Sequence, residues 1–219
     1  MNINTKKLEF IFNLRSAGVT DTKVLNIMEH IPRSRFVGDN FKIHALDDVA
    51  LPTNYGQTIT QPSVVGIMTQ ALKVTSRCKV LEVGTGTGYQ TAILSNLARR
   101  VYSLEIIKGM VLSAQERIDA LKIRNATILV KDGSDGLIEQ APFDRIILTA
   151  ATEDVSPILL KQLKTDGILV APVGMSEKFQ KIIKVEKTKF GYDYSDLKSV
   201  RFLPLTDIKS KDLHYNHML

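Results

Sequence analysis

The stretch that decides the fold of this chain is Val80-Leu81-Glu82-Val83-Gly84-Thr85-Gly86-Thr87-Gly88-Tyr89-Gln90. It begins as an apolar segment of the kind that forms a strand buried on both faces of a parallel sheet. Glycines then follow at alternate positions, which predicts a tight turn that a ligand can approach closely. Residues 89–99 read as a helix with an apolar face. Strand, glycine turn and helix together predict a nucleotide-type binding site at the open end of the strand.

The spacing of the glycines and two nearby acids narrow the choice of ligand. The pattern is Gly-x-Gly-x-Gly, and not the Gly-x-Gly-x-x-Gly of dinucleotide-binding folds. Glu82 precedes the first glycine by two residues, where a carboxylate would repel a pyrophosphate but suit a ligand with a cationic end. Glu105 ends the next apolar segment and can accept hydrogen bonds from both hydroxyls of a ribose. The combination resembles the first two motifs of the class I S-adenosylmethionine-dependent methyltransferases. An ordinary loop after a strand is the alternative, and these acids disfavour it.

Strands and helices alternate through the middle of the chain after the glycine turn. This alternation predicts a parallel, doubly wound, Rossmann-like α/β sheet. An acid at the end of its third strand, Asp132, can accept a hydrogen bond from an adenine amino group. The expected strands are 126–130, 143–151 and 167–170, and the expected helices are 110–121 and 157–163.

The two ends of the chain differ from this middle part. Helical spacing over residues 6–17, and a second helix that begins at Thr20 or Asp21 and stops at Pro32, predict an N-terminal helical cap over the cofactor site. Residues 33–62 read as a long irregular loop, which is usually functional or disordered. Near the C-terminus, residues 181–187 and 199–205 read as strands that pair antiparallel, because no helix joins them.

We therefore expect a mostly parallel seven-stranded sheet with an antiparallel C-terminal edge hairpin. The whole chain, residues 1–219, is expected to form a single methyltransferase domain. Residues 1–62 would supply the N-terminal helical cap and substrate loop, and residues 63–175 the cofactor-binding core. Residues 176–219 would supply the C-terminal antiparallel strands and tail.

Composition favours a protein of the cytoplasm. The chain is 44% hydrophobic and 24% charged, and it contains no apolar stretch long enough to span a bilayer. We expect no secretory signal, and the single Cys78 favours a reduced compartment. The formal net charge of +6 is scattered without an aromatic and basic stripe, so we expect solvated faces and no nucleic acid. The histidines, including His214 and His217, have no metal-ligand spacing, so we expect no metal.

Motifs beyond the glycine turn resemble those of one family, the protein-L-isoaspartate (D-aspartate) O-methyltransferases. The loop and the exit of the fourth strand carry the most specific part of this likeness. The family usually has Pro-Ile-Gly-His-Gly-Gln where this chain has Pro52-Thr53-Asn54-Tyr55-Gly56-Gln57. The matching segments are Ile31-Pro32-Arg33, Phe36-Val37, Leu51-Pro52, Gly56 to Pro62, Asp132-Gly133, Pro142-Phe143-Asp144, Thr149-Ala150-Ala151, Leu169 to Gly174 and Val200 to Leu205.

The resemblance implies roles for particular residues. Thr60 would be the active-site hydroxyl, at a position where the family usually has serine. The alternative for Thr58 and Thr60 is that their hydroxyls only stabilise a turn. Glu82 would act through water or turn amides. The implied substrate loop is Gln57, Thr58, Ile59 and Thr60, and the implied cofactor-binding residues are Glu82, Gly84, Gly86, Gly88, Glu105, Asp132, Gly133 and Thr206.

The implied activity is transfer of a methyl group from S-adenosyl-L-methionine to the free carboxylate of L-isoaspartyl and D-aspartyl residues in damaged proteins. The ester then closes to a succinimide and begins repair. A carboxylate with an ordinary pKa of about 4 is already ionised near neutral pH, so no general base is needed. The family is usually monomeric. Two alternatives stay open: a related class I methyltransferase that acts on RNA, and a homologue that binds the cofactor without catalysis.

Overall fold

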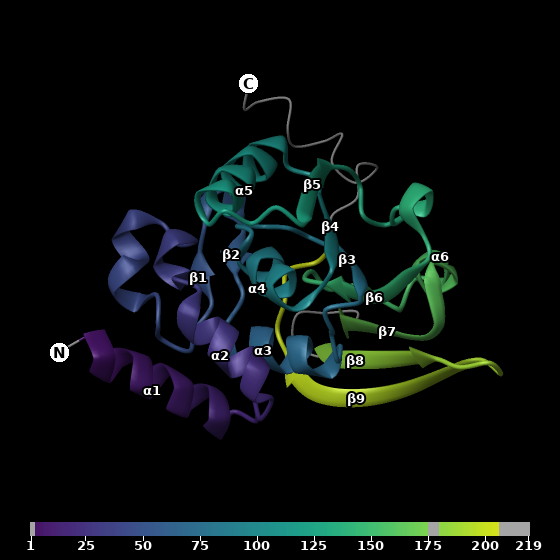
Figure 1. Cartoon of the computed structure of the whole chain (residues 1–219), viewed down its shortest axis with the longest axis horizontal. Helices are drawn as coiled ribbons and strands as arrows, with labels where there is room; N and C mark the ends of the chain where they lie inside the picture. Colours follow the sequence, from purple (N-terminus) through teal and green to yellow (C-terminus); the bar gives the residue numbers. More distant parts are fainter. Residues whose placement is uncertain (1–2, 175–179, 206–219) are drawn as a thin grey trace.

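A single seven-stranded sheet forms the centre of the computed structural model, which describes residues 3–174 and 180–205 (Figure 1). Its strand order is β5-β4-β3-β6-β7-β8-β9. The strands are β3 (Lys79–Val83), β4 (Arg100–Glu105), β5 (Ala126–Val130), β6 (Phe143–Leu148), β7 (Leu163–Val173), β8 (Gln180–Lys187) and β9 (Tyr192–Val200).

Strands β3 to β7 pair in parallel, whereas β7–β8 and β8–β9 pair antiparallel. The chain runs outward from β3 through β4 to β5 and then returns to the other side of β3 as β6. Ligands of doubly wound sheets bind at such a reversal, beyond the carboxyl ends of the strands. The mostly parallel sheet with an antiparallel C-terminal edge is confirmed.

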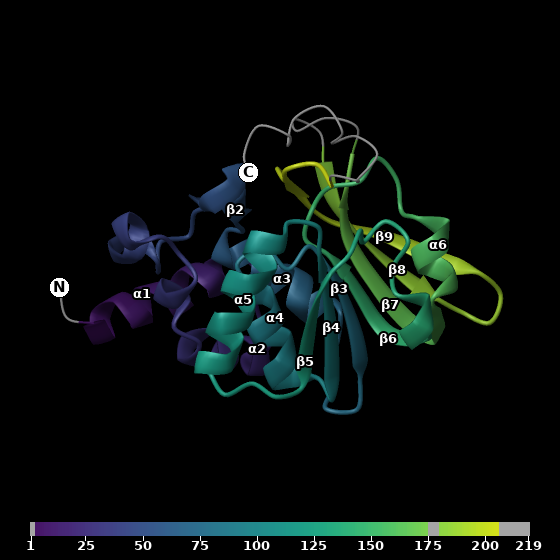
Figure 2. The same ribbon diagram turned by 90° about the horizontal axis from the view of Figure 1, so that it is seen from above.

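Helices cover both faces of the sheet (Figure 2). Helices α3, α4 and α5 lie on one face and α6 lies on the other. Side chains of β3 alternate between the two faces, so Val80 joins the core under the first group of helices while Leu81 and Val83 join the core on the other face. The helices are α1 (Ile3–Ser16), α2 (Thr22–His30), α3 (Pro62–Ala71), α4 (Tyr89–Leu97), α5 (Lys108–Ala120) and α6 (Pro157–Lys161).

The N-terminal helices lie beside the sheet's helical layer. Asp21 caps α2, because its carboxylate accepts hydrogen bonds from the backbone N–H groups of Lys23 at 2.8 Å and Val24 at 3.2 Å. Helix α1 packs on α2 and α3, and α2 packs on α3 and α4. Within the described residues, neither α1 nor α2 contributes to the pocket above the glycine turn. The N-terminal helices are present as expected, but they pack beside α3 and α4 and do not cover the pocket where the cofactor is expected.

The segment that reads as irregular contains short regular elements. A small antiparallel hairpin joins β1 (Leu51–Pro52) to β2 (Thr58–Ile59). The 3-10 helices η1 (Arg33–Arg35) and η2 (Asp39–His44) precede it, and η3 (Asn54–Gly56) lies in its turn. Leu51 faces Ile59 across this hairpin, and both side chains are buried. A further 3-10 helix, η4 (Ile138–Gln140), lies before β6. The hairpin gives the expected substrate loop a fixed register.

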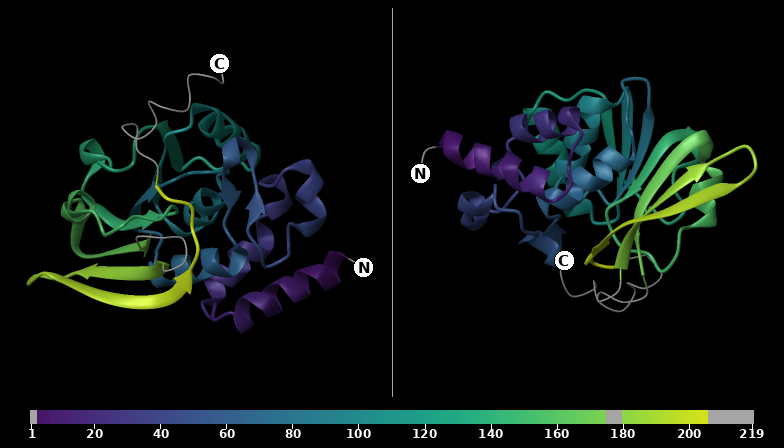
Figure 3. Two further views of the ribbon diagram at one scale, coloured as in Figure 1. Left: turned by 180° about the vertical axis from the view of Figure 1, so that it is seen from behind. Right: turned by 90° about the horizontal axis from the view of Figure 1, so that it is seen from below.

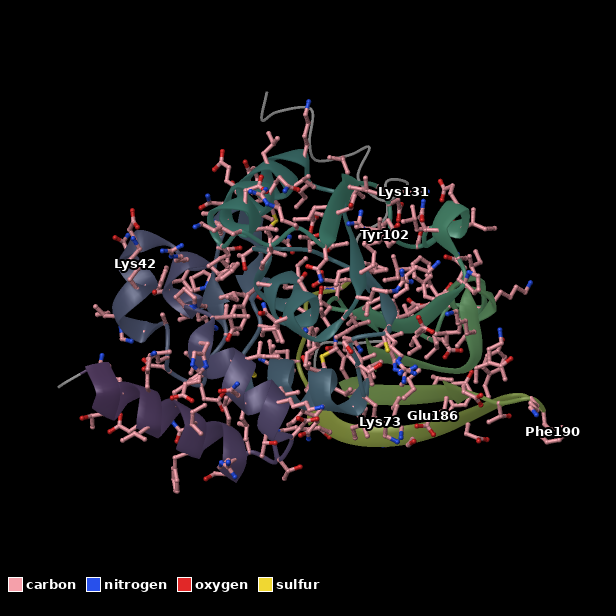
Figure 4. All side chains as sticks on the ribbon, viewed as in Figure 1. Lys42, Lys73, Tyr102, Lys131, Glu186 and Phe190 are labelled. Atoms are coloured by element: carbon pink, nitrogen blue, oxygen red, sulfur yellow. The ribbon has the colours of Figure 1, made fainter. Side chains whose placement is uncertain are left out.

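The prediction of a strand at residues 199–205 is wrong. The edge strand is β9, which is exposed along most of its length and forms a long hairpin with β8 (Figure 4). Phe190, at the tip, is fully exposed, and Lys73 lies 3.6 Å from the Glu186 carboxylate on β8. Residues 201–205 instead leave β9 and cross the middle of the molecule (Figure 3). There the backbone N–H of Ala151 donates to the Leu203 carbonyl at 2.9 Å.

Candidate active site

A pocket lies over the carboxyl ends of β3, β4, β5 and β6, where the strand order reverses. The glycine turn and the ends of the strands form its floor. The loop between β1 and α3 forms one wall, and the segment after β9 forms another. The lining residues are Gln57, Thr58, Ile59, Thr60, Val65, Met68, Val83, Gly84, Thr85, Gly86, Thr87, Tyr89, Gln90, Leu104, Glu105, Ile106, Ile107, Lys131, Gly133, Thr149, Ala150, Phe202, Pro204 and Leu205.

Gly84 adopts a conformation and occupies a space that other residues cannot. Its φ is +95°, in the region that favours glycine, and a Cβ there would collide with the hydroxyl oxygen of Thr149 at the end of β6. The Gly84 N–H donates to the Leu104 carbonyl at 2.8 Å, and the Thr149 hydroxyl donates to the carbonyls of Val83 and Gly84. The turn is thus held from β4 and β6, and its backbone faces the pocket.

Glu105 lies where β4 meets the pocket. One carboxylate oxygen accepts the N–H of Gly86 at 3.0 Å, and the other accepts the N–H of Ile107 at 3.0 Å. Each oxygen of a carboxylate has a further lone pair for another donor. The buried carboxylate therefore has the acceptor capacity that a pair of ribose hydroxyls requires.

Glu82 lies behind the glycine turn, outside the pocket. Its side chain is completely buried, and Oε2 accepts the hydroxyl proton of Thr91 on α4 at 2.5 Å. Burial raises the pKa of Glu82 from 4.5 to about 8, with a smaller contribution from the Glu105 charge in the same direction. Near neutral pH the group is therefore mostly protonated. Glu82, expected among the cofactor-binding residues, thus does not line the pocket and instead links β3 to α4.

Two other expected cofactor residues lie beside the pocket without lining it. Gly88 begins α4 with a φ of +90°, and a Cβ there would come within 3.3 Å of the Ala114 side chain on α5. The Asp132 carboxylate accepts the N–H of Ser134 at 2.9 Å, while its neighbour Gly133 lines the pocket. Gly88 therefore allows α4 and α5 to pack closely, and Asp132 shapes the turn after β5.

All of the expected substrate loop, residues 57–60, lines the pocket opposite the glycine turn. The Asp48 carboxylate fixes the end of this loop, because it accepts the N–H of Ser63 at 2.8 Å and the side-chain amide of Gln61 at 3.0 Å. Thr60 itself is half-buried. The structure thus brings Thr60 into the same pocket as Gly84 and Glu105, as the sequence predicts.

A buried arginine holds the loop from behind. Arg33 is only 1% exposed, and its guanidinium donates to the carbonyls of Ala45 at 2.8 Å, Val49 at 3.1 Å and Thr60 at 3.2 Å. The same group lies 5.9 Å from the ring centre of Tyr89, which lines the pocket at the start of α4. Burial lowers the pKa of Arg33, and the nearby Tyr89 and Asp48 oppose that effect. Arg33 thus links the loop backbone to the helix that follows the glycine turn.

Sequence reasoning missed several residues of the site. Arg33 and Thr149 belong to motifs of the family, but the sequence assigned neither a role. The signal for Thr149 is its place at the exit of a strand next to the switch point, where ligands bind. Phe202, Pro204 and Leu205 reach the pocket because the chain returns across the sheet after β9. No local pattern signals that return, since the same apolar spacing is typical of a strand.

Some expectations fall on residues outside the described ranges. These are Thr206, His214 and His217. Within residues 3–174 and 180–205, no three His, Cys, Asp or Glu side chains gather in a group that could hold a metal ion. Among the helices in the same ranges, none combines the length and apolar character needed to cross a membrane.

Comparisons with known proteins agree with this geometry. The family profile described as "Protein-L-isoaspartate(D-aspartate) O-methyltransferase (PCMT)" matches residues 5–210. A protein-L-isoaspartate O-methyltransferase of Roseobacter denitrificans is 52% identical over 207 residues, which are 94% of this chain and 97% of that protein. One from Cereibacter sphaeroides is 54% identical over 202 residues, or 92% of each chain.

Solved structures share the fold. One, titled protein-L-isoaspartate O-methyltransferase, superposes with a TM-score of 0.82 at 23% identity over 92% of this chain and 66% of that chain. Another, from Plasmodium falciparum and in complex with S-adenosyl-L-homocysteine, has a TM-score of 0.77 at 24% identity over 90% of this chain and 97% of that chain. By the profile match and the close relatives, this chain belongs to the protein-L-isoaspartate (D-aspartate) O-methyltransferase family.

Proposed function

We propose that this protein transfers a methyl group from S-adenosyl-L-methionine to the free carboxylate of L-isoaspartyl and D-aspartyl residues in damaged polypeptides, which begins their repair through a succinimide. One observation carries the proposal. A hydroxyl-bearing loop, residues 57–60, and a glycine turn with an acid after the next strand line the same pocket. The names of the close relatives support the same activity.

The pocket suits a nucleoside-containing cofactor without phosphates. Gly84 and Gly86 present backbone against which the amino-acid tail would lie, and Glu105 would accept the ribose hydroxyls. Gly133 lines the pocket without a side chain, and a Cβ there would collide with Val83, so the adenine would lie against bare backbone at this position. When bound, S-adenosyl-L-methionine supplies a methyl group activated by its sulfonium charge.

The loop's part in the reaction is to position an anion. The substrate carboxylate is already ionised near neutral pH, so the site needs no group to remove a proton. The Thr60 hydroxyl and nearby backbone amides can hold one carboxylate oxygen in line with the methyl group at near-contact distance. The cationic Arg33 faces the carbonyl side of the loop, where it orients Thr60. We propose Thr60 as the catalytic residue on this basis.

We further propose that the chain works as a single domain in the cytoplasm. It would act as a monomer on polypeptides, without nucleic acid or membrane as a partner. The scattered distribution of the +6 net charge supports the absence of a nucleic-acid role. Sedimentation and electrophoretic mobility assays with RNA would test these points.

A methyl-transfer assay with radiolabelled S-adenosyl-L-methionine tests the proposed function. Matched peptides that differ only by aspartyl or isoaspartyl at one position serve as substrates. We expect methylation of the isomerised peptide alone. Methylation of transfer RNA without peptide methylation would support the RNA methyltransferase alternative. Cofactor binding without transfer to any peptide or RNA would support a non-catalytic homologue.

Thr60→Ala should lower kcat for an isoaspartyl peptide about ten-fold, which corresponds to one lost hydrogen bond to a charged group. Cofactor affinity should stay close to that of the wild type, because the Glu105 and glycine contacts are unchanged. Initial-rate kinetics measure kcat, and calorimetric titration with S-adenosyl-L-homocysteine measures the cofactor affinity. Thr60→Ser provides the conservative control. Equal losses of turnover and cofactor affinity would show that the loop only builds the cofactor pocket.

Glu105→Ala should mainly affect cofactor affinity, in contrast to Thr60→Ala, which should mainly affect turnover. Loss of the acceptor for the ribose hydroxyls should weaken binding of S-adenosyl-L-homocysteine about ten- to a hundred-fold, as expected for charge-assisted hydrogen bonds. The affinity for adenosine should fall by a similar factor, whereas the affinity for methionine should not change. Competition experiments with the two fragments measure both affinities. Unchanged affinity for adenosine would contradict the assignment of Glu105 to the ribose.

A further inference from the structure

A second pocket lies next to the active site, on the far side of the substrate hairpin. It shares Gly86 and Thr87 with the first pocket. Residues 52–55, which form one strand and the turn of the hairpin, make one wall, while η2 and α5 make the others. Pro52 pairs directly with Thr58 of the substrate loop. The second pocket is therefore one strand away from the residues that would hold the isoaspartyl group.

Arg117 is the cationic side chain of this pocket. It projects from α5, is half-buried, and donates to the Thr87 carbonyl at 3.3 Å. Among the described residues no carboxylate forms an ion pair with it. Burial lowers the pKa of Arg117, and the charge of its helix neighbour Glu116 opposes that effect. The guanidinium stays charged in proteins, and it has several donors beyond the one used here.

The rest of the pocket suits a side chain with an apolar stem and an anionic end. Phe41 and Tyr55 line the same pocket as Arg117 and offer aromatic surface, whereas Phe36 is fully buried beneath it. The acid of the lining, Asp39, is exposed and pairs with Lys42 at 2.7 Å, so its charge is largely compensated. A carboxylate with a short methylene stem would pair with Arg117 and pack its stem on the aromatic rings.

Tyr55 fixes the rim of the pocket. Its backbone adopts a φ of +62°, which is uncommon outside glycine, and its hydroxyl packs against Gly109 in the first turn of α5. A side chain at Gly109 would collide with it. This part of the loop, Thr53 to Tyr55, is also where the sequence departs from the usual family pattern. The hairpin therefore meets α5 in an arrangement built from this chain's own residues.

We propose that the second pocket binds an acidic side chain of the substrate polypeptide, close in sequence to the isoaspartyl residue, through Arg117. The proposal rests on the proposed function. An extended polypeptide advances about 3.3 Å per residue, so a flank of a few residues spans the width of the hairpin. The pocket would thus make flanking glutamate or aspartate a determinant of substrate preference.

A peptide series tests the proposal. Each isoaspartyl peptide carries glutamate or its isostere glutamine at one position before or after the isoaspartyl residue. We expect the wild type to show a KM about five- to ten-fold lower for glutamate at one flanking position, the range of a moderately buried charge pair. Arg117→Gln should abolish this preference while kcat is retained. Lys108→Gln, which removes an exposed cation from the same helix, should preserve it.

Charge reversal separates pairing from general electrostatics. Arg117→Glu should prefer lysine over glutamine at the position where the wild type prefers glutamate. A preference that survives in Arg117→Gln, or that Lys108→Gln loses equally, would overturn the proposal, and so would equal KM values for all wild-type peptides. If the wild type methylates the isoaspartyl peptides without discrimination, the proposed function stands and only the acidic subsite fails. No methylation of any isoaspartyl peptide would overturn both.

Discussion

Arg33→Met is expected to lower the free energy of unfolding by about 3–5 kcal/mol, the usual range for disrupting a buried charged group's contacts. The guanidinium donates to three backbone carbonyls, those of Ala45, Val49 and Thr60. Methionine fills similar volume but leaves these acceptors unpaired, and each buried unpaired group costs about 1–3 kcal/mol. The loss should therefore greatly exceed that of a surface substitution. Urea unfolding measures it.

The same arginine should also affect turnover, because it holds Thr60 from the carbonyl side. Arg33→Lys keeps the charge but loses the planar fork that reaches several carbonyls at once. We expect this milder variant to fold, to retain cofactor affinity and to lose at least about ten-fold in kcat, the effect of one misplaced hydrogen bond to a charged group. A positioning role predicts that kcat falls while the affinity for S-adenosyl-L-homocysteine stays constant.

A double-mutant cycle with Thr60→Ala distinguishes positioning from a merely structural role. If Arg33 acts on catalysis through Thr60, the kcat effects of Arg33→Lys and Thr60→Ala should be strongly non-additive, because the second change removes the hydroxyl that the first misplaces. Additive effects on kcat would contradict the positioning role. A purely structural role would instead lower stability and leave kcat near the wild-type value for the folded fraction.

Local sequence patterns predict the parts of the fold that depend on residues close to one another in the chain. The glycine turn, Glu105 and the alternation of strands with helices all follow from short-range periodicity, and each lies where expected. Asp21 could be anticipated as a cap because a cap needs only the next turn of the helix. The substrate loop enters the pocket as expected, but that expectation came from the family resemblance, since hydroxyl-rich loops alone predict only turns.

The elements that sequence reasoning misplaced depend on distant partners. Strand β9 is exposed along most of its length and is mainly polar over residues 195–199, so it lacks the sustained alternation of apolar and polar residues that marks a half-buried strand. Residues 202–205 are mostly apolar, as in a strand, but Phe202 and Leu205 line the pocket, and the backbone of this segment bonds to Ala151, which is far away in sequence. Likewise, Arg33 reaches Thr60 across 27 positions, and no local pattern encodes such a contact.

Glu82→Gln should change how stability depends on pH. Burial raises the pKa of Glu82 from 4.5 to about 8. Between these values the folded chain retains a proton that the unfolded chain releases, so the free energy of unfolding falls as pH rises, by about 1.4 kcal/mol per unit. The stabilisation from the neutral carboxyl is fully present below the unfolded value and is lost as pH rises through about 8.

Glutamine cannot release a proton, so this contribution should disappear from the variant. The variant should therefore gain stability relative to the wild type as pH increases, by roughly 2–3 kcal/mol between about pH 5.5 and 7.5. Urea unfolding of both proteins at about pH 5.5, 6.5 and 7.5 measures the difference in slope. Glu153→Gln, which replaces an exposed glutamate, should parallel the wild type.

The outcome also decides how Glu82, on the strand before the glycine turn, supports that turn. Glu82 joins Thr91 on α4, and Thr85 of the turn joins Ser103 on β4 directly opposite Glu82. A neutral carboxyl can both donate and accept in such a hydroxyl network, whereas a carboxylate only accepts. If Glu82→Gln keeps cofactor affinity and only flattens the pH dependence of the free energy of unfolding, the neutral acid supports the turn structurally and does not bind the cofactor. Parallel pH profiles for wild type and variant would mean that Glu82 is charged in the folded protein, and its burial would then need a cation near the turn.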